Sequence, residues 1–291
     1  MLTQIQGGIR WFRAIRLCCI GAAVCLSGVA RAADGDLEEV PNISYIHAAV
    51  LGTGTYTLND RRMTMLKLPI SWKQRPATAE SVGWRWLAPV VLGYDDLSKM
   101  DSDIVGALLP DQLVTLSVMP GVEFIYPVNQ HLYLKPFVEI GGGRDFNIDE
   151  NFALTHLGIR SYSPFEVGEN WQFRIGAGVR WAGEYQFKSE DTNALGIIDL
   201  GFDVRRNLWF KVFEQRANMG AYYIYQRYLP EWSTGNSVDW DGKAREVHEF
   251  GLSLGVPQGK RFLGINLRRV RVGYKKGGKF QGWTLGTEFP F

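Results

Sequence analysis

The sequence predicts an all-β chain that closes as a transmembrane, antiparallel up-and-down β-barrel of about twelve strands. Three observations predict this class: a short apolar leader, alternation of apolar and polar residues through most of the remaining chain, and an aromatic final strand. No stretch after Val29 approaches the eighteen apolar residues of a membrane helix. Lipid leaves backbone groups without partners unless strands close into a barrel, so a membrane chain of this kind must close.

Residues 1–32 are predicted to be a secretory signal peptide. Residues 1–16 carry three arginines and no acid, residues 17–29 are an apolar run, and Ala30-Arg31-Ala32 is a small-x-small cleavage pattern. All three cysteines of the chain lie within the apolar run. We therefore expect cleavage near Ala32 and a cysteine-free barrel domain at 33–291, with neither disulfides nor thiol catalysis.

Cleavage changes the balance of charge. The full chain has 32 basic and 30 acidic residues, and four basic residues and no acid lie in residues 1–32. The remaining 28 basic and 30 acidic residues give a formal charge of −2. A nucleic-acid partner is not expected, because there is no basic surplus to neutralise phosphates.

Alternation with a period of two predicts the strands in order. A first strand is expected at 44–58, and the clearest one at 171–181, where Trp171 and Trp181 share one face. Ten residues of tilted strand rise by about 25 Å, the height of the apolar band of a membrane barrel. The strands expected in order are 44–58, 64–72, 82–94, 114–126, 132–140, 156–160, 171–181, 198–204, 207–230, 245–256, 262–274 and 283–291.

Short turns are expected on one side and longer loops on the other. The turns include 205–207 and 256–261, and the loops include 95–111 and 231–244. An even number of strands then requires 207–230 to be one long, kinked strand. Arg268-Arg269 is expected to form a bulge that keeps the apolar face continuous.

The two faces of these strands predict two sets of residues. Aromatic residues at the edges of the outward face are expected to form a membrane girdle: Trp72, Trp84, Tyr94, Trp171, Trp181, Trp283 and Phe291. The polar residues opposite are expected to line a hydrated or salt-bridged lumen: Arg85, Glu123, Lys135, Glu139, His156, Arg160, Arg174, Arg180, Asp199, Asp203, Lys211, Glu249, Arg271 and Glu288. In a soluble sandwich the same polar residues would form the solvated surface, but paired tryptophans at this spacing favour the barrel.

The last nine residues place Trp283, Leu285, Thr287, Phe289 and Phe291 on one face. This ending resembles the C-terminal strand of Gram-negative outer-membrane β-barrels, in which a final Phe and alternate apolar residues form the signal read by the assembly machinery. The resemblance implies that Trp283, Leu285, Phe289 and Phe291 are the assembly signal and that the barrel-assembly machinery is a partner. It also implies an integral outer-membrane location in contact with lipid and lipopolysaccharide.

The size of the chain and its closing strands, rich in Arg, Gly and aromatic residues, resemble the translocator barrel of an autotransporter, occurring as a solitary domain. That resemblance implies twelve strands and carries over no catalytic residue. A translocator normally follows a secreted passenger and a helix that threads the pore. Only about ten residues, 33–42, precede the first expected strand, which does not favour a covalent passenger.

Function is expected to lie in the lumen or in the loops. The four histidines, His47, His131, His156 and His248, lie in no His-x-Ser-Asn context, and no metal-ligand spacing or phosphate loop is present, so we predict no catalytic residue, cofactor or metal. The expected function is a non-enzymatic outer-membrane barrel that acts as a narrow pore, a translocator-like channel or a surface scaffold whose loops 95–111 and 231–244 make contacts. The alternative is a lipid-modifying hydrolase of the phospholipase or deacylase type, using His156 or His248.

Overall fold

The computed structural model describes residues 45–58, 61–78, 81–95, 114–212, 214–234, 245–262 and 265–291. These residues belong to one compact unit, Asn42–Phe291. The expected signal peptide at 1–32 and most of the expected loops at 95–111 and 231–244 lie outside the described residues.

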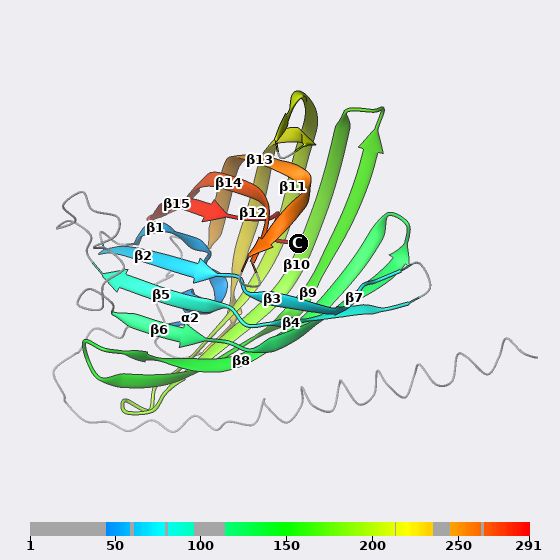
Figure 1. Ribbon diagram of the computed structural model, residues 1–291. Helices are drawn as coiled ribbons and strands as arrows, with labels where there is room; N and C mark the ends of the chain where they lie inside the picture. Colours follow the sequence, from blue (N-terminus) through cyan, green and yellow to red (C-terminus); the bar gives the residue numbers. More distant parts are fainter. Residues whose placement is uncertain are drawn as a thin grey trace, which may run out of the picture. The chain divides into compact units, whose positions relative to one another are not determined.

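A single antiparallel sheet closes into a barrel of twelve strands, as the sequence predicts (Figure 1). The closure is made where β1 pairs with β15 and where β8 pairs with β9. Three of the twelve strands are each broken into two segments, namely β2 with β3, β4 with β5, and β6 with β7. The fifteen segments are β1 Thr53–Leu58, β2 Arg61–Leu68, β3 Ser71–Arg75, β4 Gly83–Leu87, β5 Val90–Asp95, β6 Thr115–Val118, β7 Gly121–Asn129, β8 Leu132–Asp145, β9 Glu150–Val167, β10 Trp171–Gln186, β11 Thr192–Val212, β12 Gln215–Thr234, β13 Glu246–Phe262, β14 Ile265–Gly277 and β15 Phe280–Gly286.

Each of the three breaks contains a proline: Pro69, Pro89 and Pro120. Proline has no backbone N–H to donate to the ladder, so it interrupts a strand locally. The sheet nevertheless continues across the breaks, because Met119 N–H donates to the Pro89 carbonyl at 3.1 Å and Ile140 N–H donates to the Pro120 carbonyl at 2.9 Å. The barrel wall therefore stays closed past the prolines.

The two faces of the wall differ as the alternation predicts. On β10, Ile175 and Val179 are exposed outward, whereas Gly176 and Gly178 between them are buried. Leu252 on β13 is 62% exposed, an unusual value for a leucine at the centre of a strand. Exposed apolar residues also continue over the neighbouring strands: Leu200, Phe202, Phe250, Leu254, Val270, Val272, Trp283 and Leu285.

Two of the expected turns are wrong in position. Strand β11 continues through 205–207 to Val212, and Asn207 pairs with Asn218 of β12. Residues 207–230 therefore belong to two strands, and the number of strands stays at twelve because β11 ends at Val212 and β12 begins at Gln215. Likewise β13 extends through 256–261. In the sequence, two consecutive arginines indicate a turn. Inward and outward faces nevertheless continue to alternate here, because Arg205 is buried against Asp203 on the same strand.

The irregularity expected at Arg268-Arg269 falls mainly on the opposite strand. Gly255 pairs with Arg269 and Lys260 pairs with Leu267, so four residues of β13 lie opposite the single residue Arg268. The bulge does shift the register at the predicted place. The extra residues, however, belong to β13.

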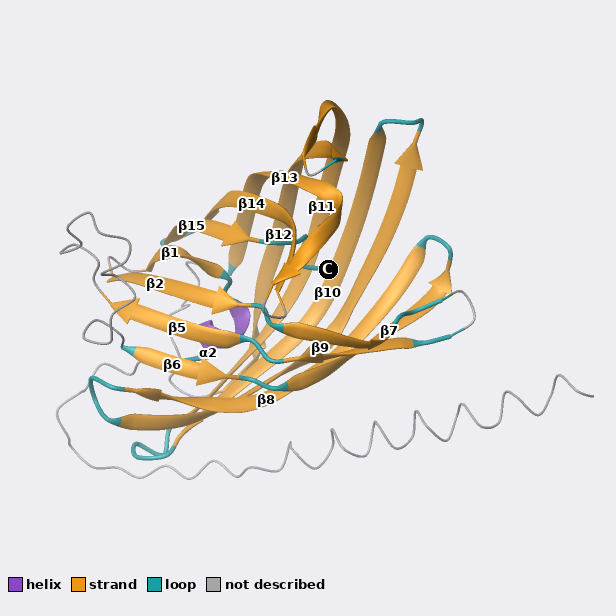
Figure 2. Ribbon diagram, viewed as in Figure 1, coloured by secondary structure: helices purple, strands orange, loops and turns teal. Residues whose placement is uncertain are grey.

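The first expected strand, 44–58, is wrong in its first half. Residues Ile46–Val50 form a short helix, α2, and only Thr53–Leu58 form a strand (Figure 2). Every residue of α2 is buried. A run that is buried on all sides cannot alternate between lipid and lumen, so it lies inside the barrel.

The end of the chain also departs from the prediction. Strand β15 stops at Gly286, and Phe289 and Phe291 are each only 7% exposed. Their side chains pack against Tyr222 and Ile224, which face the lumen. Phe291 is therefore inside the barrel and not on the lipid face, because Pro290 has no N–H to extend the ladder and buried partners are available within.

Candidate functional site in the barrel lumen

Helix α2 fills one part of the lumen. It contacts β5, β9, β10 and β11, and the apolar cluster around it draws side chains from the whole circumference: Tyr56, Met65, Val91, Met119, Phe152, Leu154, Ala182, Leu195, Ile197, Tyr228, Val247 and Phe280. At its start, Tyr45 stacks on Phe152 with ring centroids 4.0 Å apart. The Tyr45 hydroxyl donates to Asp145 at 3.0 Å. Burial, together with the Asp145 carboxylate, raises the pKa of Tyr45, which keeps this donor protonated.

Lys67 of β2 holds the other end of α2. Its Nζ donates to the carbonyls of Ala49 at 2.8 Å and Ala48 at 3.4 Å. The last carbonyls of a helix have no intrahelical partner and carry partial negative charge, so a cation at this point stabilises the helix. The helix is thus fixed at both ends by polar contacts and on its sides by apolar packing.

The tail 287–291 fills a second part of the lumen. Cβ atoms placed on Gly176 and Gly201 would lie 2.2 and 2.4 Å from atoms of the Phe291 ring. The two glycines therefore form the surface on which this ring lies. Lys135 Nζ donates to the Phe291 backbone oxygen at 2.9 Å, and Arg160 donates to the Pro290 carbonyl at 3.3 Å.

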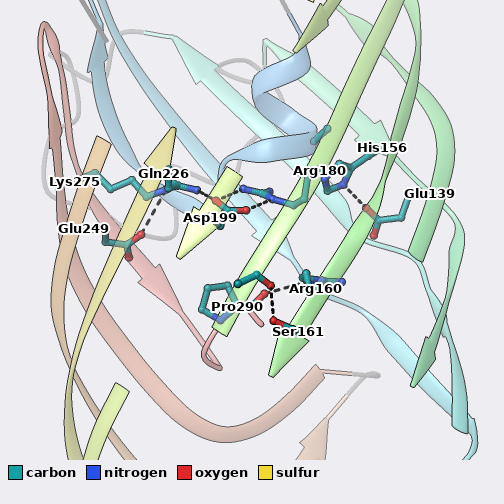
Figure 3. Close-up of polar contacts among 12 residues, drawn as sticks. Glu139, His156, Arg160, Ser161, Arg180, Asp199, Gln226, Glu249, Lys275 and Pro290 are labelled. Carbon is teal, nitrogen blue, oxygen red and sulfur yellow. Dashed lines mark hydrogen bonds and ion pairs between the residues drawn. The ribbon is translucent and has the colours of Figure 1, made fainter. Parts of the chain in front are cut away.

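A polar layer separates the two apolar fillings (Figure 3). Lys275 Nζ donates to Gln226 at 2.7 Å, Gln226 donates to Asp199 at 2.7 Å, and Asp199 accepts two hydrogen bonds from Arg180. These residues come from β14, β12, β11 and β10. Glu249 of β13, the strand between β14 and β12, lies 3.5 Å from Lys275, so five consecutive strands contribute to the layer. The layer forms because inward-facing residues of adjacent strands lie at the same height in the barrel wall.

The register places this layer between the fillings. On β10, Ala182 faces α2, Arg180 belongs to the polar layer and Gly176 faces Phe291. On β11, Ile197, Asp199 and Gly201 repeat this order. The lumen is therefore packed along its length in the part of the chain that the structure describes, with helix, ion pairs and tail in sequence.

Two buried glutamates neutralise most of the remaining arginines. Glu123 is fully buried and pairs with Arg85 at 2.8 Å and with Arg160 at 2.6 Å. Glu249 accepts hydrogen bonds from Tyr222 at 2.9 Å, Thr284 at 2.8 Å and Arg271 at 3.1 Å. Buried carboxylates with several donors of this kind fix the strands on either side and fill the lumen with charge pairs.

His156 and Glu139 form a buried pair, with Nδ1 and Oε2 2.7 Å apart. His156 Nε2 is buried without a hydrogen-bond partner among the described residues. A Glu-His pair supplies two members of a catalytic triad, but here no serine or threonine hydroxyl lies on Nε2. His248, the other histidine considered for catalysis, contacts the Tyr223 hydroxyl at 2.8 Å. Among the residues that the structure describes, no serine or threonine hydroxyl is in position as a nucleophile on either histidine.

The structure brings most of the predicted lumen residues together. The inward residues with buried or half-buried polar contacts are Arg85, Glu123, Lys135, Glu139, His156, Arg160, Arg174, Arg180, Asp199, Asp203, Glu249 and Arg271. Glu288 is an exception, because it lies exposed on the tail after β15 ends. Lys211 is exposed next to the turn that follows β11.

The aromatic residues predicted for the girdle divide into two groups. Trp72, Trp171 and Trp283 are exposed on the outer face, and Trp84 and Trp181 are half-buried. Tyr94 is buried, contrary to expectation. Tyr94 pairs with Thr64 of β2 next to the end of β5, and a break in the ladder does not explain its burial.

Several lumen residues are missing from the prediction. Lys67, Gln226 and Lys275 join the polar contacts, and Arg269 donates to Ser253 at 2.7 Å and also contacts Asn218. A sequence signal exists for some of them: between 218 and 228 every even-numbered residue is buried. The inward face of this segment can be assigned only when the turn is placed between Val212 and Gln215.

No group of three or more metal-ligating residues occurs among the residues that the structure describes. Within the same residues, none of the helices is long and apolar enough to cross a membrane.

No protein-family model matches the chain, and no curated protein sequence matches it either. A solved structure does match: the crystal structure of the β domain of the Bordetella autotransporter BrkA. The similarity covers 80% of this chain and 93% of that one, with 12% sequence identity and a TM-score of 0.50. The chain therefore has the fold of an autotransporter-type β-barrel.

Proposed function

We propose that this protein is a non-enzymatic, integral outer-membrane barrel of translocator architecture, which serves as a closed surface anchor and not as an open pore. The observation that carries the proposal is the packed lumen, in which α2 and the tail 287–291 lie on either side of a polar layer. A conducting pore needs a continuous aqueous path. Here that path is replaced by apolar packing and ion pairs.

The outer face supports a membrane location. Apolar side chains form a band on β10 to β15, and 62% exposure of Leu252 in water would be costly. Trp171 and Trp181 lie ten residues apart on one strand, which corresponds to about 25 Å of membrane thickness. A bilayer removes these surfaces from water without a partner protein.

The position of α2 supports a role as an anchor. The two ends of the barrel differ: β5 leads to β6, and β12 to β13, through its longest connections, and we call this the long-connection end. The other is the short-turn end. Tyr45 contacts Asp145, the last residue of β8 at the long-connection end, whereas Gly52 leads into β1 at Thr53, which lies beside Leu285 at mid-height of the wall.

Short turns face the periplasm in barrels of this kind, so the long-connection end is the cell surface. The chain at Tyr45 is then directed outward. Such an arrangement suits a surface anchor whose barrel is closed by α2 near its outer end.

The hydrolase alternative has little support. His156 has an acid partner but no hydroxyl, and α2 and the tail fill the lumen on either side of it. We expect the refolded protein to release no fatty acid from phospholipid or lipid A. Sustained lipid turnover that His156→Gln abolishes would favour the hydrolase instead.

Location and orientation can be tested with single cysteines, because the sequence after Cys25 contains none. Asn147→Cys lies in the exposed turn between β8 and β9, and Glu169→Cys lies in the exposed turn between β9 and β10, at the opposite end. In intact cells a membrane-impermeant maleimide should label Asn147→Cys and leave Glu169→Cys unlabelled. Permeabilising the outer membrane should expose Glu169→Cys.

The two positions are matched controls for each other, because both are polar, exposed turn residues. Equal labelling of both in intact cells, or of neither after permeabilisation, would contradict the proposed location. Labelling of Glu169→Cys alone would reverse the orientation of the barrel.

A further inference from the structure

A groove lies on the outer face of the wall at the long-connection end. Its volume is about 880 Å³, and it is lined by Arg227, Arg245, Glu246, His248, Phe250, Lys276, Gly277 and Gly278. These residues come from the end of β12, the start of β13 and the end of β14. The groove therefore lies outside the lumen.

Two strands show the same sequence of side chains on the outer face toward this groove. On β14, Val270 and Val272 are followed by Tyr274 and then by Lys276. On β13 the order toward the same end is Leu254, Leu252, Phe250, His248 and Glu246. Apolar, aromatic and charged levels in this order correspond to acyl chains, membrane interface and lipid headgroups. The groove is thus at headgroup depth.

The charges of the groove favour an anion. Arg227, Arg245 and Lys276 supply three cations against one carboxylate, Glu246. Arg227 and Glu246 are 4.0 Å apart and more than half exposed, a loose pair that leaves the guanidinium available. His248 is held by the Tyr223 hydroxyl and stacks on that ring, so it forms part of the floor.

We propose that this groove binds a phosphate of a phosphorylated glycolipid, of the lipid A type, in the outer leaflet. Arg227 and Lys276 flank β13 from either side, about 10 Å apart by strand spacing, so both can reach one headgroup. Guanidinium and ammonium groups are the side chains that bind phosphate. Phe250, 58% exposed next to them, lies where the first part of an acyl chain would pass. A lipid fits both parts of the groove, whereas free phosphate uses only the cations.

The inference rests on the proposed membrane location, and its test separates the two. The protein is refolded in dodecyl maltoside micelles, and folding of every variant is checked by heat-modifiable gel mobility. Binding of fluorescently labelled, diphosphorylated lipid A is then followed by anisotropy. The test variant is Arg227→Gln/Lys276→Gln. The matched control, Lys211→Gln/Arg268→Gln, removes the same charge from exposed positions at the short-turn end.

We expect the test variant to bind about tenfold more weakly or worse, because charge-assisted hydrogen bonds to phosphate are lost. The control variant should bind as the wild type does. Arg227→Lys/Lys276→Arg should keep most of the affinity, and a glycolipid without phosphate should bind wild type and test variant equally weakly.

Equal binding by the test and control variants would overturn the site, as would equal affinity for phosphorylated and unphosphorylated glycolipid. Displacement of the lipid by millimolar inorganic phosphate would show that the groove recognises the anion alone, which also contradicts the proposal. Failure of the wild type to fold in micelles would instead count against the barrel in a membrane.

Discussion

Glu123 shows how much of the lumen depends on single charges. Its carboxylate is fully buried and is shared by Arg85 on β4, the strand next to β7, and by Arg160 on β9. Removing one member of such a group leaves charge buried without compensation. The exposed pair Arg144–Asp149, in contrast, has both side chains more than half in solvent.

We therefore expect Glu123→Gln to lower the free energy of unfolding by about 3–5 kcal/mol, because two half-buried arginines lose the fully buried carboxylate that pairs with them. Asp149→Asn, which breaks the exposed pair, should cost about 0–1 kcal/mol. Urea unfolding of the refolded barrel, followed by tryptophan fluorescence, measures both. Similar small losses for the two variants would mean that the Glu123 pairs do not hold the wall.

At the residue scale, alternation predicts most of the lumen. The inward positions of Glu139, Arg180 and Asp199 follow from parity within uninterrupted strands. The pairing partners of these residues cannot be predicted in the same way, because pairing depends on the register between strands. Placing the turn at 205–207, when it lies between Val212 and Gln215, changes every neighbour between β11 and β12.

Helix α2 is the element that is hardest to predict from the sequence. Its residues are all buried and do not alternate, which is inconsistent with a strand that has one polar face, yet a helix this short has no 3.6-residue pattern to detect. Only the closed wall explains its burial, because its partners come from strands far apart in the sequence.

Lys67 gives a test of how α2 is held. Lys67→Met removes the donor to the carbonyls of Ala48 and Ala49 while keeping most of the side-chain volume. We expect α2 to leave its position more often, so that brief channel openings appear in planar bilayers. Lys188→Met, an exposed lysine after β10, is the control and should remain as quiet as the wild type. Silence of both variants would show that apolar packing alone holds the helix.

The tail 287–291 can be tested through two glycines of β10. A Cβ on Gly176 would lie 2.2 Å from the Phe291 ring, whereas a Cβ on Gly178 would meet its nearest atoms at 3.5 Å. Gly176→Ala should therefore cost about 1–3 kcal/mol through overpacking, and Gly178→Ala should be nearly neutral. Urea unfolding of the two variants measures the difference, and equal costs would contradict the position of Phe291.

The tail also shows why its prediction from alternation was wrong. Trp283 and Leu285 are outward as expected, and the ladder ends at Gly286, so the faces of Phe289 and Phe291 are no longer set by parity. The proposed role of these residues as an assembly signal stays a prediction. It concerns the chain before it folds, when the final segment is still free.

At the scale of the whole molecule, closure and strand number follow from the sequence more securely than any boundary. Twelve strands result because inward and outward faces repeat along the chain and β1 must meet β15 to leave no open edge. The state of the lumen does not follow from this count. A barrel of this size can be hydrated, salt-bridged or filled, and only the positions of α2 and the tail distinguish these states.

Single-channel conductance in planar bilayers tests directly whether the protein's own segments close the lumen. Wild type would be compared with a variant that starts at Gly52 and ends at Gly286, which lacks both fillings. We expect the wild type to insert and remain closed and the shortened variant to show stable open currents. Stable open currents of the same size from the wild type would show that α2 and the tail do not close the lumen.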